Sequence, residues 1–174
     1  IKDCMMTPIS PFDTHSHRYD EWFDRNSNIY ESELEAVRMM VPKDGEGLEI
    51  GVGTGRFAVP LGITRGIDPC VAMKKIAEKR GLSVDIGVAE RLPYTDASFD
   101  FALMVTTVCF VDDIKAAFRE AFRVIKPGGA FITGFIDKVS PIGVFYNEKK
   151  KKSLFYRNAA FFSADEISRH LEES

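Results

Sequence analysis

The chain has 174 residues, which is enough for one domain with a buried core, and 45% of them are hydrophobic, as is ordinary for a globular protein. Its formal net charge of −3 argues against a large positive surface for nucleic acid or for an anionic membrane. No apolar run is long enough to span a bilayer and no signal-like stretch stands at the start, so a cytoplasmic protein is expected.

Apolar periodicity predicts helices and strands that alternate along the chain. Leu34, Val37 and Val41 recur at helical spacing, and Ser163 with Glu166 forms a capping-box pattern for the last helix. We expect helices at 31–41, at 56–61, at 68–80, from Asp112 or Asp113 to 125, and at 163–173. We expect strands at 47–50, 63–67, 84–86, 99–105 and 130–136, and an irregular segment rich in aromatic residues and lysine at 137–162.

Strands that alternate with helices imply right-handed crossovers and a parallel sheet covered on both faces. The expected fold class is therefore α/β, a Rossmann-like doubly wound and mostly parallel sheet, whose ligands bind at the carboxyl ends of the strands. We expect a single domain over 1–174. Its parts are an N-terminal lid and helix (1–41), a cofactor-binding core (47–136), and a substrate-side loop with the last helix (137–174).

Three glycines, Gly51, Gly53 and Gly55, follow the first expected strand and precede a helix. Glycines let the backbone turn sharply and approach a ligand, and the N–H groups at a helix start favour an anionic or polar group. A nucleoside would fit this place, and the alternative is a plain tight turn. Arg56 stands where the dinucleotide fingerprint Gly-x-Gly-x-x-Gly has its last glycine, which disfavours a nicotinamide dinucleotide.

Asp68 ends the second expected strand. A carboxylate at this place can accept hydrogen bonds from both ribose hydroxyls of a nucleoside. The alternative is that Asp68 only caps a helix in which Pro69 takes the first position and which Gly81 closes. Because the acid accompanies the glycine loop, ribose binding is favoured.

A resemblance to a known family rests on motifs that come in family order and at family spacing. They are LEIGVGTGRF at 48–57, GIDP at 66–69, AERLPY at 89–94, SFD at 98–100 and VIKPGG at 124–129. With them the chain resembles the class I S-adenosylmethionine-dependent methyltransferases. The similarity is greatest to the branch with a methyltransferase type 11 domain, which includes the ubiquinone and menaquinone methyltransferases. The resemblance implies methyl transfer with S-adenosylmethionine as cofactor.

The resemblance also implies which residues bind the cofactor. Glu49 would lie near the ammonium group of the methionine part, Asp68 would hold the ribose, and Glu90 would lie at the adenine edge. The implied cofactor-binding residues are Glu49, Gly51, Gly53, Gly55, Asp68, Pro69, Ala89, Glu90, Val105 and Thr106. Val88 stands where many relatives have an acid for the adenine amino group, so Glu90 either takes over that contact or is a surface charge.

The segment after the fourth expected strand, 105–110, is mostly apolar and lacks an Asn-Pro-Pro-Tyr-like motif. It favours a small organic acceptor that is methylated by in-line displacement. The aromatic opening segment is either a lid over the cofactor or an anchor for the first helix. The implied substrate and lid residues are Tyr19, Trp22, Phe110 and Tyr146, and no catalytic residue is assigned.

Other charged and metal-binding residue types have plainer interpretations. The lysine run 149–152 has two possible roles: it recognises a carboxylate or phosphate group of the acceptor, or it belongs to a solvated loop. The loop is favoured because runs of charged residues are usually exposed. His15 and His17 have no acid or cysteine cluster nearby, so no metal site is expected. The cysteines are scattered and form no Cys-x-x-Cys pair; they are Cys4, Cys70 and Cys109.

Two further functions stay open at this point. One is a module that binds S-adenosylmethionine without catalysis and serves regulation or partner binding, and the other, disfavoured by Arg56, is a nicotinamide-dependent oxidoreductase. The resembled family usually ends its sheet with two more strands, the last of them antiparallel, and we expect these to be missing here. The sheet edge is then exposed or covered by a partner, which leaves a homo-oligomer open.

Overall fold

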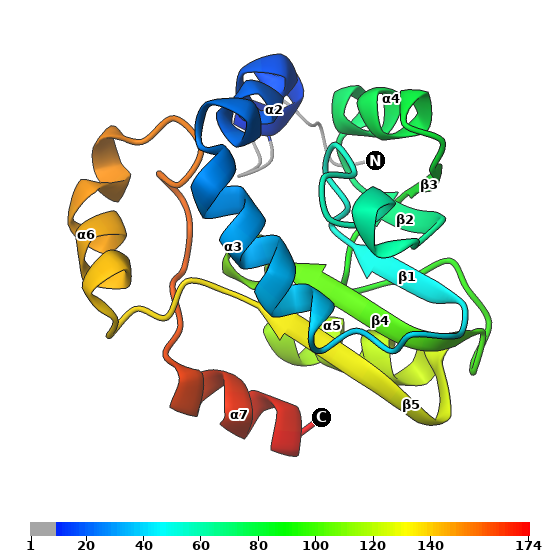
Figure 1. Ribbon diagram of the computed structural model, residues 1–174. Coiled ribbons are helices and arrows are strands. Elements are labelled where there is room, and N and C mark those ends of the chain that lie inside the picture. The colour runs from blue at the N-terminus through cyan, green and yellow to red at the C-terminus, as the bar shows by residue number, and fades with distance from the viewer. Residues whose placement is uncertain (1–9) are drawn as a thin grey trace.

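The computed structural model describes residues 10–174, so Cys4 and the start of the expected N-terminal segment lie outside it. Its centre is a five-stranded, all-parallel sheet in the order β3-β2-β1-β4-β5 (Figure 1). The strands are β1 (Gly47–Ile50), β2 (Arg65–Asp68), β3 (Ser83–Ile86), β4 (Phe99–Val105) and β5 (Ile125–Gly134). This order, with β1 in the middle and the direction of winding reversed between β1 and β4, confirms the expected Rossmann-like α/β fold.

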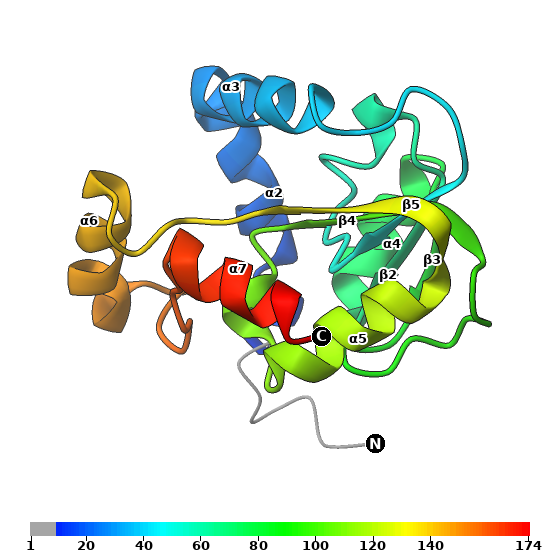
Figure 2. The same ribbon diagram turned by 90° about the horizontal axis from the view of Figure 1, so that it is seen from below.

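Helices cover both faces of the sheet. Figure 2 shows α3 on one side of the strands, and α5 and α7 on the other. The helices are α1 (Ser10–Thr14), α2 (Ser16–Arg25), α3 (Ser27–Arg38), α4 (Val71–Lys79), α5 (Ile114–Val124), α6 (Pro141–Lys149) and α7 (Ala164–Glu172). Short 3-10 helices are η1 (Val59–Leu61), η2 (Val108–Phe110) and η3 (Lys150–Lys152). Within residues 10–174, none of the helices has the length and hydrophobicity that crossing a membrane requires.

The residues of β4 show how the core is built. Ala102 and Met104 belong to the hydrophobic cluster that α5 and α7 cover, whereas Phe101 and Leu103 belong to the cluster that α3 covers. Successive side chains of a strand point to opposite faces of the sheet. A stretch of strand that is buried on both faces is therefore mostly apolar, as residues 101–104 are here, which is why this strand is evident in the sequence.

Two expected helix starts are confirmed by their capping hydrogen bonds. The Asp113 carboxylate accepts the N–H of Ala116 at 3.0 Å and begins α5. At α7, the N–H of Glu166 donates to the Ser163 hydroxyl at 3.2 Å, and the N–H of Ser163 donates to the Glu166 carboxylate at 2.7 Å. Each bond satisfies an N–H group that has no partner inside the helix.

Several expected element boundaries need correction. α4 begins at Val71 after Cys70, not at Pro69, because the Asp68 carboxylate accepts the Cys70 N–H and keeps this turn extended. The expected helix at 56–61 contains only η1, and α3 spans Ser27–Arg38 and not 31–41. β2 spans Arg65–Asp68 and not 63–67, and β5 spans Ile125–Gly134 and not 130–136, so it begins before the Pro-Gly-Gly break.

The segment 137–162 was expected to be irregular, and this is wrong because it contains α6 and η3. The Ser140 hydroxyl accepts the N–H of Gly143 at 3.1 Å, and Pro141 takes the first turn of α6, where it needs no N–H partner. α6 has almost no apolar stripe, so apolar periodicity could not reveal it. The Ser-Pro pair was the local signal that could have indicated its start.

Candidate functional site

A small and a large cavity adjoin at the carboxyl ends of β1, β2 and β4. The small one, which we call the crevice, has a volume of ≈ 90 Å³, and the large one, which we call the aromatic cavity, has a volume of ≈ 700 Å³. Tyr19 and Thr106 line both of them. The crevice is lined by Phe12, Tyr19, Gly51, Gly53, Asp68, Pro69, Cys70, Met73, Val105, Thr106, Thr107 and Phe110.

The structure brings most of the predicted site residues together at these cavities. Those that line the crevice are Gly51, Gly53, Asp68, Pro69, Val105, Thr106, Tyr19 and Phe110. Trp22 and Tyr146 line the aromatic cavity. Four predicted residues line neither cavity: Glu49, Gly55, Ala89 and Glu90.

Asp68 is the central polar residue of the crevice and is only 7% exposed. One of its carboxylate oxygens accepts the N–H of Gly53 at 2.8 Å, and the other accepts the N–H of Cys70 at 2.8 Å. Burial raises the pKa of Asp68 to about 6, against the lowering effect of these two hydrogen bonds. The carboxylate thus joins the end of β2 to the glycine loop after β1 and orders both sides of the crevice.

The glycines of the loop differ in what they do. Gly53 has φ +53°, and a Cβ added there would meet only the Tyr19 ring, at 3.8 Å. Its backbone is therefore open to a ligand once Tyr19 moves. Gly55 has φ +82°, and a Cβ there would lie 2.5 Å from Leu82. Gly55 is needed for packing between the loop and β3, so the structure places it in the core and away from the crevice.

Glu49 is an acid inside the central strand and is only 2% exposed. Its Oε2 atom has no hydrogen-bond partner among the described residues. Burial raises the pKa of Glu49 well above its ordinary value, although the N–H of Ala58 hydrogen-bonds to it. The charges of Asp68 and Glu49 both raise the pKa of Tyr19, after burial itself, so all three groups are within electrostatic reach of one another.

Glu90 takes part in local structure outside the crevice. Its carboxylate accepts the N–H of Asp112 at 2.6 Å and that of Asp113 at 3.3 Å, just before α5. The carboxylate therefore lies at the positive N-terminal end of that helix. Ala89 is buried in the core cluster beneath α5. The structure thus places neither residue in the crevice.

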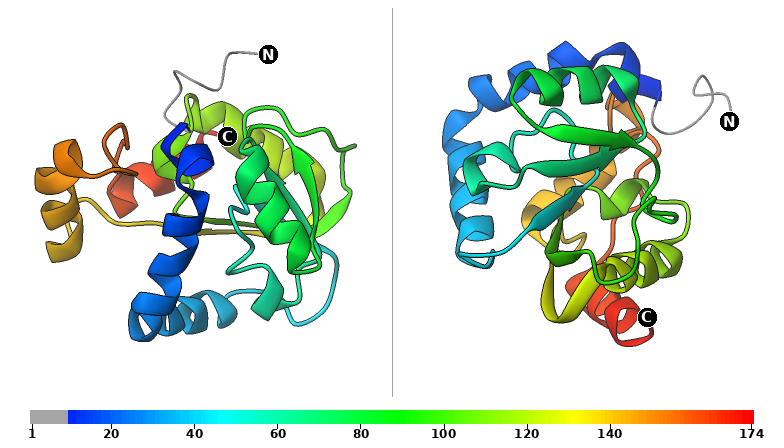
Figure 3. Two further views of the ribbon diagram at one scale, coloured as in Figure 1. Left: turned by 90° about the horizontal axis from the view of Figure 1, so that it is seen from above. Right: turned by 90° about the vertical axis from the view of Figure 1, so that its right-hand side faces the viewer.

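Helix α2 crosses the carboxyl end of the sheet between α4 and α6 (Figure 3) and is held there by Asp20. The Asp20 carboxylate accepts hydrogen bonds from Thr54 at 2.7 Å, from Arg56 at 2.8 Å, and from Arg80 at 2.7 Å. Burial alone would raise the pKa of Asp20, but the bonds from Arg80, Arg56 and Thr54 outweigh it and hold the pKa below its usual range. The ion pairs tie α2 to both the glycine loop and α4.

Aromatic rings of the N-terminal helices close the crevice from above. Phe12 packs against Tyr19 with ring centroids 5.5 Å apart and against Phe110 at 4.9 Å. The rings of Phe12 and Tyr19 also contact the ring of Phe155, which follows η3, with ring centroids 5.1 Å and 5.6 Å apart. Phe12 and Phe155 were not predicted, because only the fold brings these distant segments together. These contacts hold α1 and α2 against the segments after β4 and η3, and a lid role for the same rings stays a prediction.

Thr106 lies where the two cavities adjoin and has an unusual backbone. Its φ is +53°, in the left-handed region that residues other than glycine seldom adopt. Its N–H donates to the carbonyl of Gly134 at 2.7 Å, which holds the end of β4 against β5. Strained residues of this kind cluster at binding and catalytic sites. The structure therefore brings Thr106, which the family resemblance implies as a site residue, to the place where the two cavities adjoin.

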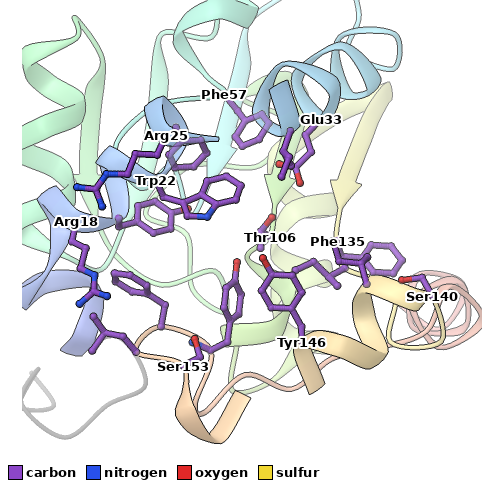
Figure 4. Close-up of a pocket in the computed structure, with 18 of the residues that line it drawn as sticks. Arg18, Trp22, Arg25, Glu33, Phe57, Thr106, Phe135, Ser140, Tyr146 and Ser153 are labelled. Atoms are coloured by element: carbon purple, nitrogen blue, oxygen red, sulfur yellow. The ribbon is translucent and has the colours of Figure 1, made fainter. Parts of the chain in front are cut away.

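The aromatic cavity lies between α2, α3 and α6 (Figure 4). Its aromatic lining residues are Tyr19, Trp22, Phe23, Phe57, Phe135, Tyr146, Phe155 and Tyr156. Its charged lining residues are Arg18, Arg25, Glu33, Asp137 and Lys152. Of the lysine run, only Lys152 lines the cavity, while Lys150 donates to the carbonyl of Ala159 at 3.0 Å.

Comparison with known proteins shows which protein family has this architecture. Residues 48–133 match the family model described as Methyltransferase domain. An uncharacterized protein of Methanocaldococcus jannaschii is 51% identical over 165 residues, which are 95% of this chain and 80% of that protein. A Demethylmenaquinone methyltransferase of Roseiflexus is 41% identical over 98 residues, 50% of this chain and 41% of that enzyme.

A solved structure from Thermotoga maritima is similar over 95% of this chain and 79% of that one, with a TM-score of 0.92 and 49% sequence identity. It is described as a SAM-dependent methyltransferase and possible histamine N-methyltransferase. Together, the fold and the crevice define a Rossmann-like protein with a crevice at the point where the strand order reverses, which is where such folds bind ligands. The chain belongs to the class I S-adenosylmethionine-dependent methyltransferases and is an enzyme of that family.

Proposed function

We propose that the chain binds S-adenosylmethionine in the crevice and transfers its methyl group to a small-molecule acceptor in the aromatic cavity. The observation that carries this proposal is the charge of the crevice. Asp68 lines it, the buried Glu49 is within electrostatic reach of Tyr19, and none of the described lining residues is lysine or arginine. Such surroundings favour a ligand with positive sulfonium and ammonium groups over the anionic pyrophosphate of a dinucleotide.

The described residues fit this cofactor. Asp68 would accept hydrogen bonds from the ribose hydroxyls, and the open backbone at Gly53 would support the nucleoside. The orphaned Oε2 of Glu49 would find a partner in the ammonium group of the methionine part. The bound cofactor supplies an electrophilic methyl group on a sulfonium sulfur.

The protein's own residues would assist methyl transfer by aligning the two reactants and by excluding water. Thr106 and Tyr19 line both cavities, so an acceptor in the aromatic cavity would meet the cofactor beside them. Alignment of two reactants can supply up to about 7–11 kcal/mol of the barrier in the best intramolecular cases. Burial raises the pKa of Tyr19 above its ordinary value, so its hydroxyl keeps its proton and can donate a hydrogen bond. The aromatic cluster of Phe12, Tyr19 and Phe155 would exclude water.

The size of the aromatic cavity supports a small-molecule acceptor. Its ≈ 700 Å³ is within the range of about 300–1,000 Å³ that is usual for small-molecule pockets. Its lining is aromatic with a few charged groups, as such pockets require. The description of the Thermotoga protein as a possible histamine N-methyltransferase also agrees with an acceptor of this size.

Calorimetric titration with S-adenosylhomocysteine and, in parallel, NAD tests the cofactor. We expect S-adenosylhomocysteine to bind and NAD not to bind. Asp68→Asn should lower the affinity at least about tenfold, because a hydrogen bond to a charged group contributes about 1.5–3 kcal/mol. Asp44→Asn, a change at an exposed acid, is the matched control. Tight binding of NAD, or an unchanged dissociation constant in Asp68→Asn, would contradict the proposal.

A further inference from the structure

Helix α6 presents apolar side chains to solvent. Val144 is 46% exposed and Phe145 is 57% exposed, while Val139, just before the helix, is 68% exposed. We call these three residues the apolar patch. The helix has almost no apolar stripe, because apolar residues lie on its outer side as well as beside the buried Gly143. Exposed apolar side chains that gather on one surface mark contacts with a protein or a membrane.

The outer side of α6 is open to solvent within residues 10–174. Figures 1 and 2 show the helix at the margin of the molecule, away from the sheet. Its inner side faces the aromatic cavity, which Ile142 and Tyr146 line, whereas the residues of the apolar patch line neither cavity. The patch is therefore separate from the places where we propose that the cofactor and the acceptor bind.

Positive charge adjoins the apolar patch. In the segment 139–162 the chain has five basic residues and one acid, Glu148. Lys149 and Lys151 are exposed, and neither forms an ion pair with a residue of the described range. The net charge of −3 argues against a large positive surface, but this segment of α6 and η3 is a small one.

A surface that is both apolar and positive limits what can cover it. A second copy in a two-fold dimer would bring equal patches and their lysines together, and like charges repel. A nucleic acid would attract the lysines but would leave the apolar side chains without apolar partners. A membrane with anionic lipids offers phosphate groups to the lysines and an acyl boundary to the apolar side chains.

We propose that α6 and η3 dock the protein on the surface of a membrane that contains anionic lipids. Val139, Val144 and Phe145 enter the boundary between headgroups and acyl chains, and Lys149 and Lys151 lie against the phosphate groups. The docking is peripheral and reversible, because it combines a small apolar area with a few charges. It goes beyond the proposed methyl transfer and does not depend on it, since none of these five residues lines a cavity.

Sedimentation of the protein with lipid vesicles tests the charged part of the surface. We expect binding to vesicles of phosphatidylcholine and phosphatidylglycerol in equal parts, little binding to phosphatidylcholine alone, and weaker binding at high salt. Lys149→Gln combined with Lys151→Gln should weaken the binding by about tenfold or more. The matched control is Lys75→Gln combined with Lys79→Gln, two exposed lysines of α4, and it should bind as the wild type does.

A second pair of variants tests the apolar part. Val139→Ser combined with Phe145→Ser should also weaken the binding by about tenfold or more, because the apolar side chains no longer leave water. Phe145→Leu should keep most of the binding. Met39→Ser combined with Met40→Ser is the matched control, since these methionines are 80% and 67% exposed at the end of α3. All the exchanged side chains are exposed, so the midpoint of thermal unfolding should stay unchanged.

Each other result counts against the proposal. Absence of binding to anionic vesicles at low salt would overturn it. Binding that survives in the double serine variant of the patch would show attraction by charge alone, and an equal loss in the methionine variant would show unspecific adsorption. A dimer in solution that the patch variant abolishes, without vesicle binding, would assign this face to a second copy. Failure to bind S-adenosylhomocysteine would contradict the proposed function only, so the two failures are distinguishable.

Discussion

Two buried carboxylates near the ends of the central strands are expected to weaken the folded state and to favour the binding of a positively charged ligand. Glu49 is 2% exposed and Asp68 is 7% exposed, and burial raises the pKa of both. A buried charge without a full set of partners weakens the folded state. Groups with pKa values perturbed in this way are concentrated at functional sites. In the function that we propose, a positively charged ligand completes this arrangement.

The raised pKa of Asp68 makes cofactor binding depend on pH. Because the pKa is about 6, we expect the affinity for S-adenosylhomocysteine to fall as the pH drops below about 6, where the protonated carboxyl loses an acceptor for the ribose. Calorimetric titration at several pH values measures this. Asp68→Asn cannot titrate, so its weaker affinity should not show this step. A wild-type affinity that stays constant down to about pH 5 would disprove this role.

The raised pKa of Asp68 also makes the stability of the ligand-free protein depend on pH. Protonation of Asp68 is easier in the folded state than in the unfolded state, where its pKa is near 3.8. The contribution of Asp68 to the free energy of unfolding is therefore fully present below pH 3.8 and is lost as the pH rises through about 6.

Glu49→Gln should separate stability from binding. The amide removes a buried charge, so we expect the ligand-free variant to be at least as resistant to thermal unfolding as the wild type at neutral pH. If Glu49 holds the ammonium group of the cofactor, the affinity for S-adenosylhomocysteine should nevertheless fall by about tenfold or more. Thermal unfolding with and without ligand measures both effects. Equal ligand-induced stabilisation in variant and wild type would exclude this role.

Among the elements, α2 is the one that decides access to the crevice. It brings Tyr19 over Gly53, and Asp20 attaches the helix to Arg56 and Arg80. These ion pairs are mostly shielded from water, with side-chain exposure of 17% for Asp20 and 28% for Arg80. Their strength therefore exceeds that of an exposed pair, and they set how easily the helix leaves the sheet.

Asp20→Ala should loosen α2. The change leaves Arg80 without its carboxylate partner, while Arg56 keeps Asp24 at 2.8 Å, and we expect it to cost about 2–4 kcal/mol of unfolding free energy. Limited proteolysis should cut within residues 10–25 sooner than in the wild type. Glu21→Ala removes the exposed pair with Arg25 and is the matched control, expected to leave both measurements nearly unchanged. Equal behaviour of the two variants would show that the Asp20 ion pairs do not anchor the helix.

At the scale of the whole molecule, aromatic side chains of the N-terminal helices narrow the crevice of the described structure. Its volume of ≈ 90 Å³ is well below the about 300–1,000 Å³ that is usual for small-molecule pockets. Phe12 and Tyr19 occupy the space above Gly53 and Asp68. The strands beneath are buried, so we expect α1 and α2 to be the parts that move when the cofactor enters. Binding is therefore expected to be gated by the opening of these helices.

The single tryptophan makes this gating measurable. Trp22 lies on α2, so its fluorescence should change when S-adenosylhomocysteine binds. In stopped-flow mixing we expect the observed rate to reach a plateau with ligand concentration, because opening of α1 and α2 becomes limiting. Asp20→Ala should raise that plateau, and Glu21→Ala should not. A rate that increases linearly over the whole concentration range would rule out a limiting opening step.

The sequence by itself determined the features that depend on neighbouring residues. β1 and β4 have their predicted bounds, and the caps of α5 and α7 involve residues three positions apart. The glycine loop and Asp68 were recognisable because their spacing follows the order of strands and helices in a parallel sheet. The family, too, was evident from short motifs in sequence order.

Only the tertiary structure decided how the site is closed. Phe12 and Asp20 act on residues far away in the chain, such as Phe110 and Arg80, so no local pattern marks them. Only the structure also shows that Gly55 and Glu90 line neither cavity, and that Gly55 packs against Leu82 while Glu90 accepts a hydrogen bond just before α5. Periodicity and capping report the chain's immediate surroundings, whereas burial and charge balance depend on segments that meet only when the sheet forms.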